Sequence, residues 1–251
     1  MENIQNKLPN SLIKVFKEKK IQDINGNFVN FHSGIEYKEA ELLVHVINKI
    51  KPKNTLEIGL AMGTSALCFL DAKSKYSKKS IHIAIDPNQY RDYAGVGVKL
   101  VKDSGLDDNF KLIEGKTHEI FADILKENIK LDMAFVDGWH TFDYTLIDFF
   151  YIDQILKVGG IIAFHDMYGL SKQKVLKYIL THRKYRVMKE YKISEKNKIA
   201  VLKFFIWRII KSPLLIFSKF HWTFQTKSPY GIIFLEKLSD FEPDYNFYKS
   251  F

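Results

Sequence analysis

The stretch Thr55-Leu-Glu-Ile-Gly-Leu-Ala-Met-Gly-Thr-Ser-Ala66 decides the fold of this chain. An apolar run containing Glu57 leads to two glycines, Gly59 and Gly63, and Ser65 then opens a pattern typical of a helix. This order predicts a buried strand that turns sharply into a helix, with glycines where the backbone must approach another group. In open α/β folds such a turn is where nucleotide-like cofactors bind, because the N–H groups at the helix start attract negative charge. The spacing is neither the dinucleotide fingerprint nor the phosphate loop, so a purely structural turn remains the alternative.

Strands and helices alternate on both sides of this stretch. Apolar strands alternating with helices indicate an α/β fold: a doubly wound, mostly parallel sheet covered on both faces. Strands are expected at 56–59, 80–86, 110–114, 133–136, 161–164, 185–191 and 199–204, and helices at 65–71, 93–102, 118–128, 142–156 and 175–182.

Polar or small residues stand at the carboxyl ends of five successive strands. In a parallel sheet these ends share one edge, which is where ligands bind. The alternative is that any α/β sheet places polar residues where its strands leave the core. The residues concerned are Glu57 and Gly59, Asp86, Glu114 and Gly115, Asp137, and His165 with Asp166.

Asp86 and Thr117 are candidates for holding a nucleoside. Asp86 comes 23 residues after Gly63, the place where an acid can accept both hydrogen bonds of a ribose diol. The alternative is that it forms a turn ahead of Pro87. Thr117 follows the third strand, where it is suited either to line an adenine edge or to cap the next helix.

The segment Val136-Asp-Gly-Trp-His140 and the pair His165-Asp166 carry the candidate chemistry. Asp137 is suited to hold an ammonium group or a divalent metal, and His140 is suited to act as general base. Two carboxylates on neighbouring strand ends favour Mg²⁺, whereas a histidine ligand such as His165 favours Mn²⁺ or Zn²⁺. The structural alternatives are an N-cap or core role for His140 and a capping role for Asp166.

From about His32 to Phe204 the chain resembles the class I S-adenosylmethionine (SAM) methyltransferases, in particular methyltransferase family 24, which is related to the catechol and caffeoyl-CoA O-methyltransferases. The resemblance implies a Rossmann-like seven-stranded sheet whose last strand is antiparallel, SAM as cofactor, and methylation of a hydroxyl group. The motifs that carry it are Leu56–Ser65, Ile85-Asp86, Leu112–Gly115, Phe135–His140 and Gly159–Asp166.

The resemblance also implies a role for each site residue. In the catechol-type enzymes a lysine stands where this chain has His140, and in family 24 a histidine is usual. Metal-dependent relatives mostly carry Asp or Glu followed by Asp or Asn where this chain has His165-Asp166, so the chain departs from that pattern at His165. A metal here would bind Asp137, His165 and Asp166. For the cofactor, Gly59, Gly63 and Ser65 would cradle the methionine part, Glu57 would support the loop, Asp86 would bind the ribose, Thr117 would lie by the adenine, and Asp137 would hold the ammonium.

Composition sets the expected organisation and location. We expect an N-terminal helical segment at 1–31, the methyltransferase domain at 32–204 and a C-terminal extension at 205–251. Cys68 is the single cysteine, and Met1–Lys7 lacks the apolar core of a signal peptide, so a cytoplasmic protein is expected. Residues 172–251 carry 17 Lys and Arg against 6 Asp and Glu, which favours an acidic partner or surface for the end of the chain.

The segment 204–224 is rich in aromatic residues and interspersed with Arg208, Lys211 and Lys219, while Pro213 prevents one continuous helix. This pattern suits a peripheral membrane contact, a homodimer contact or a lid over the acceptor. The function expected is SAM-dependent O-methylation of a small molecule or a sugar or glycan. The alternatives are an RNA methyltransferase, which the location of the basic excess outside the motifs disfavours, and a non-catalytic SAM-binding or membrane-associated interaction protein.

Overall fold

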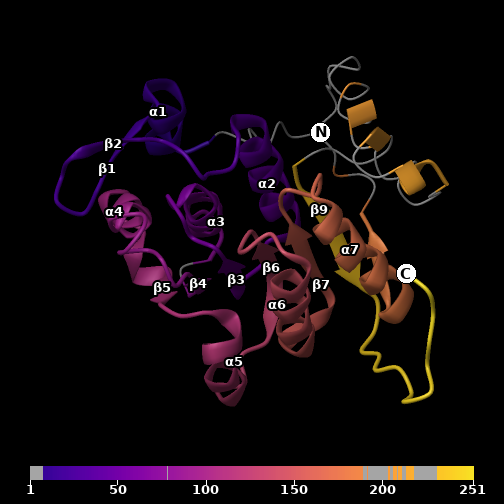
Figure 1. The fold of residues 1–251 in the computed structure, drawn as a ribbon. Helices are drawn as coiled ribbons and strands as arrows, with labels where there is room; N and C mark the ends of the chain where they lie inside the picture. The colour runs from indigo at the N-terminus through magenta and orange to yellow at the C-terminus, as the bar shows by residue number, and fades with distance from the viewer. Residues whose placement is uncertain are drawn as a thin grey trace, which may run out of the picture.

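A seven-stranded sheet forms the centre of the computed structural model, in the order β5-β4-β3-β6-β7-β9-β8 (Figure 1). The structure describes residues 8–77, 79–188, 191, 203, 206–207, 209–210, 213–217 and 231–251. The strands of the sheet are β3 (Thr55–Ile58), β4 (His82–Ile85), β5 (Phe110–Ile113), β6 (Leu131–Val136), β7 (Leu156–Phe164), β8 (Tyr185–Val187) and β9 (Ile233–Lys237).

The sheet is parallel except for β9, which pairs antiparallel with β7 on one side and with β8 on the other. This confirms the mostly parallel Rossmann-like sheet with an antiparallel last strand. The location expected for that strand was wrong. It lies at Ile233–Lys237, inside the range expected to be an extension, so the sheet draws on residues beyond 204. The range 199–204 lies outside the described residues except for Lys203, which is helical.

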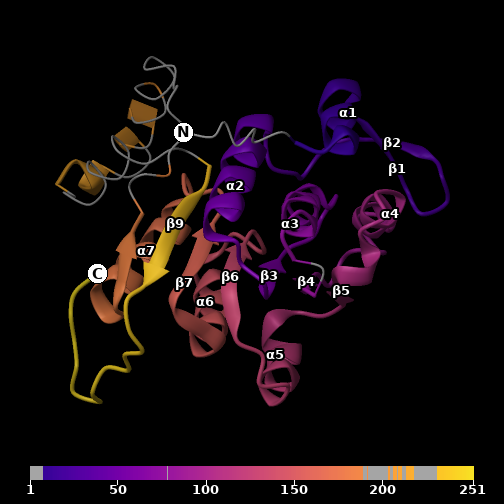
Figure 2. The ribbon, with the colours of Figure 1, turned by 180° about the vertical axis from the view of Figure 1, so that it is seen from behind.

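Helices cover both faces of the sheet, as Figures 1 and 2 show from opposite sides. The helices α2, α3 and α4 lie on one face, and α5, α6 and α7 lie on the other. Their bounds are α2 (Tyr37–Ile50), α3 (Thr64–Ser74), α4 (Val96–Asp103), α5 (Thr117–Lys126), α6 (Phe142–Ile155) and α7 (Leu170–His182).

Side-chain alternation along the strands divides the core between the two faces. On β6, Met133 and Phe135 join the cluster that includes α2 and α3, whereas Ala134 and Val136 join the cluster that includes α6 and α7. Because successive side chains of a strand point to opposite faces, an apolar strand can serve both cores only when it is covered on both sides. The apolar strands predicted from the sequence therefore pack against helices on both faces of the sheet.

The N-terminal segment contains more than the expected helix. Within its described residues, α1 (Asn10–Glu18) precedes a hairpin of β1 (Lys20–Gln22) and β2 (Phe28–Asn30). The next helix, α2, begins after Glu36, whose backbone N–H donates to Glu39 Oε2 at 2.8 Å. An acid at this position stabilises the helix start because it satisfies an N–H that has no partner within the helix.

The end of the chain returns to α7. The side chain of Lys174 donates to the carbonyl of Phe251 at 3.4 Å, and the Phe251 ring packs on Tyr178 and His182. A short 3₁₀ helix, η2 (Pro213–Phe217), lies in the segment before β9. Among the residues described, we find no helix with the length and apolar character needed to span a membrane.

Candidate cofactor and catalytic site

A cavity of about 430 Å³ opens at the carboxyl ends of the central strands. The volume and the mixture of apolar and polar walls are typical of a small-molecule site. Residues from the ends of β3, β4 and β6, from the loop before α5 and from α6 line it. They include Gly59, Ala61, Asp86, Asn88, Tyr93, Gly115, Thr117, Asp137, Trp139, Tyr144 and Asp148.

The two glycines of the β3–α3 turn allow close approach to two different segments. Gly59 has φ +91°, and a Cβ built on it would lie 2.3 Å from the carbonyl oxygen of Asp137. Only glycine therefore lets the ends of β3 and β6 meet beside the cavity. Gly63 has φ +77°, and a Cβ built on it would lie 2.8 Å from the Cα of Gly97 on α4. It permits close packing of α3 on α4 and does not line the cavity.

Glu57 and Ser65 form a buried pair beneath the turn. The Ser65 hydroxyl donates to Glu57 Oε2 at 2.6 Å, and His82 Nε2 lies 3.2 Å from Glu57 Oε1. Burial raises the pKa of Glu57 well above its ordinary value and lowers that of His82. The structure thus places both predicted residues under the loop, where they support it, and neither lines the cavity.

Asp86 lies at the end of β4 and binds the backbone of the turn that follows β3. Its Oδ2 accepts the backbone N–H groups of Leu60 and Ala61 at 2.9 and 2.8 Å, and its Oδ1 accepts that of Asn88 at 2.7 Å. A carboxylate has about four acceptor positions, so Oδ1 retains capacity for one further donor. Because Asp86 also lines the cavity, it is placed to receive a ribose hydroxyl.

Thr117 and Asp148 meet on the wall of the cavity where an adenine is expected. Thr117 is the first residue of α5, and its hydroxyl bonds to the carboxyl of Asp148 on α6. Asp148 is 2% exposed, and burial raises its pKa to about 6, although the bond from Thr117 acts in the opposite direction. Sequence reasoning missed Asp148. The available signal was an acid at helical spacing with the buried residues Thr145 and Ile152.

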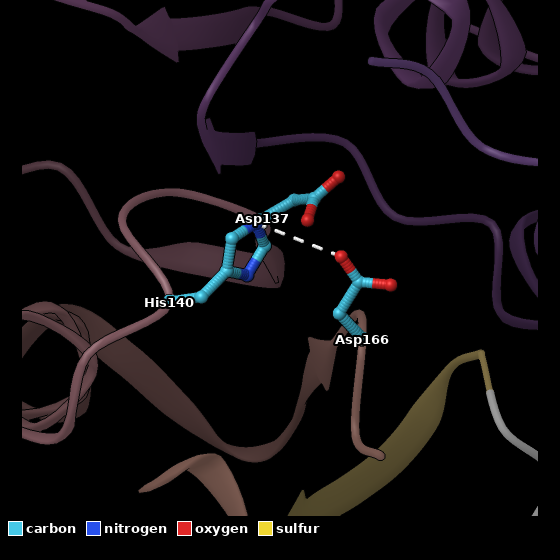
Figure 3. A group of neighbouring side chains, drawn as sticks. All are labelled: Asp137, His140 and Asp166. Carbon is cyan, nitrogen blue, oxygen red and sulfur yellow. Dashed lines mark ion pairs between the residues drawn. The ribbon is translucent and has the colours of Figure 1, made fainter. Parts of the chain in front are cut away.

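Asp137, His140 and Asp166 form an open cluster beside this cavity (Figure 3). One ligand atom from each lies within 4.8 Å of the other two, and His140 Nε2 lies 3.6 Å from Asp166 Oδ2. Asp166 follows β7 with φ +52°, a conformation uncommon outside glycine. Two carboxylates and an imidazole at this spacing can hold a divalent cation.

His165 is not available as a metal ligand, which corrects that prediction. Its Nδ1 lies 2.9 Å from Asp137 Oδ1, and its Nε2 lies 3.0 Å from Glu39 Oε2 on α2. Burial opposes a charge on the ring, but the two carboxylates outweigh it and raise the pKa of His165 to about 10. Both ring nitrogens are engaged, so His140 takes the place in the cluster that we predicted for His165.

His140 has the properties expected of a general base. Its side chain is 52% exposed, so an acceptor can reach it. Partial burial and the positive charge of Lys172 lower its pKa below the ordinary value of 6.5. The ring is therefore neutral near pH 7, and Asp166 lies close enough to stabilise the imidazolium that forms when the ring accepts a proton.

Lys172 and Glu39 are the other charged residues that sequence reasoning missed. Lys172 on α7 is 1% exposed, and its ammonium donates to the backbone carbonyl of His165 at 2.9 Å. Burial lowers its pKa, against the effect of the carboxylates of Asp137, Asp166 and Asp148. Both residues stand at buried positions of amphipathic helices, and a charged residue at such a position is the signal that could have revealed them.

Residues 56–167 match the model of methyltransferase family 24, whose description is "Methyltransferase domain". Two curated plant proteins are similar in sequence. A caffeoyl-CoA O-methyltransferase of Stellaria longipes is 30% identical over 134 residues, which is 51% of each chain. Tapetum-specific methyltransferase 1 of Arabidopsis thaliana is 30% identical over 159 residues, which is 62% of this chain and 63% of that protein. The chain thus spans between about half and two thirds of the length of these relatives.

Solved structures share the fold. The O-methyltransferase TomG from Streptomyces achromogenes in complex with SAM has a TM-score of 0.64 at 12% identity, over 94% of this chain and 93% of that one. An O-methyltransferase from Bacillus cereus in complex with S-adenosylhomocysteine (SAH) has a TM-score of 0.64 at 12% identity, over 94% of each chain. Residues 56–167 thus match a methyltransferase-domain model, and the chain as a whole shares the fold of these solved O-methyltransferases.

Proposed function

We propose that this protein is a SAM-dependent O-methyltransferase. The observation that carries the proposal is the cavity at the carboxyl ends of β3, β4 and β6, which His140 and the carboxylates of Asp137 and Asp166 flank. The relatives named above support it, because their names describe O-methyltransferases.

The residues of the cavity fit SAM. Asp86 would receive the ribose, the wall formed by Thr117 and Asp148 would face the adenine, and Asp137 would hold the ammonium of the methionine part. Gly59 keeps the floor open, since a side chain there would strike the backbone of Asp137. The bound cofactor supplies an electrophilic methyl group on a sulfonium.

In the mechanism we propose, this chain orients the acceptor and removes its proton. His140 accepts the proton of the acceptor hydroxyl at a ring nitrogen, and Asp166 stabilises the resulting imidazolium. Holding the acceptor oxygen in line with the methyl group supplies much of the rate, because a bimolecular encounter becomes an oriented contact. The exposed Trp139 and the partly buried Tyr144 on the cavity wall offer apolar contacts that would help to orient it.

The alternative to this general base is a divalent cation held by Asp137, His140 and Asp166. The oxygen and nitrogen ligands suit Mn²⁺ and, with water completing the shell, Mg²⁺. A cation there would lower the pKa of an acceptor hydroxyl. We propose a hydroxyl of a small molecule or of a sugar or glycan as the acceptor. RNA methylation and SAM binding without turnover remain the competing functions.

We also propose a cytoplasmic protein whose C-terminal segment contacts an anionic membrane surface. The support is a set of exposed apolar side chains next to a strong excess of basic residues. Ile210 is 70%, Leu214 79% and Phe217 85% exposed. Contact between two copies of the chain through the same side chains is the alternative.

Calorimetric titration with SAH tests the proposed function. We expect micromolar binding by the native chain, loss of binding in Asp86→Ala, and unchanged binding in the control Asp103→Ala, which alters an exposed acid on α4. Repeating the titration with EDTA, Mg²⁺ or Mn²⁺ tests the cation. Absence of SAH binding under all of these conditions would overturn the proposal.

A further inference from the structure

We propose that Glu39 is a positioning residue of the cofactor site, which acts through His165 to fix the carboxylate of Asp137. The inference rests on the proposed function, since it concerns the affinity for SAM and SAH. Glu39 lies on α2, outside the segment 56–167 that matches the family model.

Three side chains form a continuous buried path from α2 to the cavity. Glu39 Oε2 lies 3.0 Å from His165 Nε2, and His165 Nδ1 lies 2.9 Å from Asp137 Oδ1. The side chains of His165 and Glu39 are each 9% exposed, and that of Asp137, which lines the cavity, is 20% exposed. Only the last member of the path can therefore touch a ligand.

The geometry of the three groups sets how the path acts. Each ring nitrogen of His165 lies at hydrogen-bond distance from one carboxylate oxygen, Nε2 from Glu39 and Nδ1 from Asp137. Rotation of the ring would break these contacts. Glu39 therefore holds the ring in one orientation, and the ring in turn holds Oδ1 of Asp137.

Glu39 is itself held by the backbone at the start of α2. Its Oε2 also accepts the N–H of Glu36 at the start of α2. A Cβ on Gly231, two residues before β9, would overlap Glu39 Oε1, so this glycine leaves the room that the carboxylate occupies. The path thus connects the beginning of α2 to a single carboxylate in the cofactor site.

A double-mutant cycle on SAH affinity tests the inference. The variants are Glu39→Gln, His165→Gln and the double variant, with Glu41→Gln as a matched control on the same helix. We expect each single variant to weaken SAH binding on the order of tenfold, as loss of a charged hydrogen bond would. The double variant should bind no more weakly than the weaker single variant, because both changes break the same path.

The outcomes separate a positioning role from a structural one. Additive losses in the cycle, or a Glu39→Gln variant with native SAH affinity, would overturn the inference. Thermal unfolding of each variant shows whether an affinity change follows from a loss of folded protein. If the native chain does not bind SAH, the proposed function itself is contradicted. Failure of the inference and failure of the proposed function are therefore distinguishable.

Discussion

His140 is the residue through which the proposed chemistry can be tested most directly. It is half exposed, faces Asp166 and is not one of the residues that line the cofactor cavity. Replacing it should therefore affect turnover rather than cofactor binding.

We expect His140→Ala to lower kcat by about 10²–10⁴-fold, the usual contribution of a general base, with SAH affinity within about twofold of native. Steady-state kinetics on an accepted substrate, together with SAH calorimetry, check this expectation. The control is His118→Ala, which removes a partly exposed histidine on α5. Full turnover in His140→Ala would remove the base assignment.

The pH dependence of kcat follows from the direction of the His140 pKa. Burial and Lys172 hold this pKa below its ordinary value of 6.5, so the ring is neutral, and able to accept a proton, at and above pH 6.5. We expect kcat to be level across that range and to fall only as the pH drops below it. A kcat that rises steadily from pH 6.5 to 9 would indicate a different base.

Asp148 should make stability depend on pH. Burial raises its folded pKa from 3.8 to about 6, so the folded chain binds this proton more tightly than the unfolded chain does. Stability should fall as the pH rises through that interval, by up to about 3 kcal/mol. We expect the melting temperature of Asp148→Asn, relative to that of the native chain, to increase as the pH rises from 4 to 8. Asp103→Asn, at an exposed acid, should show no such trend.

The residues of the site divide by how far the sequence can predict them. Asp86, Asp137 and Asp166 end strands, and parallel topology brings strand ends together without knowledge of any side-chain contact. Glu39 and Asp148 reach the site from helices, and only packing of helix on sheet brings them there. The local pattern shows a charge at a buried helical position, but it does not show which group the charge meets.

At the scale of elements, β9 has the largest consequence. It is the only partner of β8 among the described strands, and it covers the edge of β7. The elements between 55 and 164 could be predicted because local periodicity reports burial on one or two faces. The place of β9 could not, because the choice of pairing partner is a long-range property of the sheet.

We expect the fragment 32–204 not to form a stable fold, although the sequence suggested these bounds for the domain. Without β9, an apolar edge of β7 is exposed and β8 has no neighbouring strand, a condition that favours aggregation. Circular dichroism and size-exclusion chromatography of this fragment, beside the full chain, measure the outcome. A monomeric fragment with a cooperative melting transition would contradict the expectation.

At the scale of the whole molecule, the uneven charge sets the expected interactions. Residues 172–251 hold the basic excess, and the exposed side chains of Leu214 and Phe217 lie in the same part of the sequence. Attraction to an anionic surface combined with insertion of apolar side chains is the usual basis of peripheral membrane binding.

We expect the full chain to sediment with vesicles that contain phosphatidylserine and to remain in solution with phosphatidylcholine alone. Binding should weaken as salt rises, because screening reduces the attraction. A Leu214→Ser/Phe217→Ser variant should lose most of the binding, whereas Leu238→Ser, at another exposed leucine, should retain it. If both variants sediment with the vesicles as fully as the native protein does, the membrane contact does not involve η2.

The insertion of β9 between β7 and β8 also bears on how the protein is made. Synthesis proceeds from the N-terminus, and β8 is complete some time before Ile233–Lys237 is added. During that interval a sheet formed from the earlier strands would leave the edge of β7 without its neighbouring strand. Exposed edges of this kind pair with other chains. The protein should therefore depend on the ribosome or on chaperones to shield that edge until the last strand has emerged.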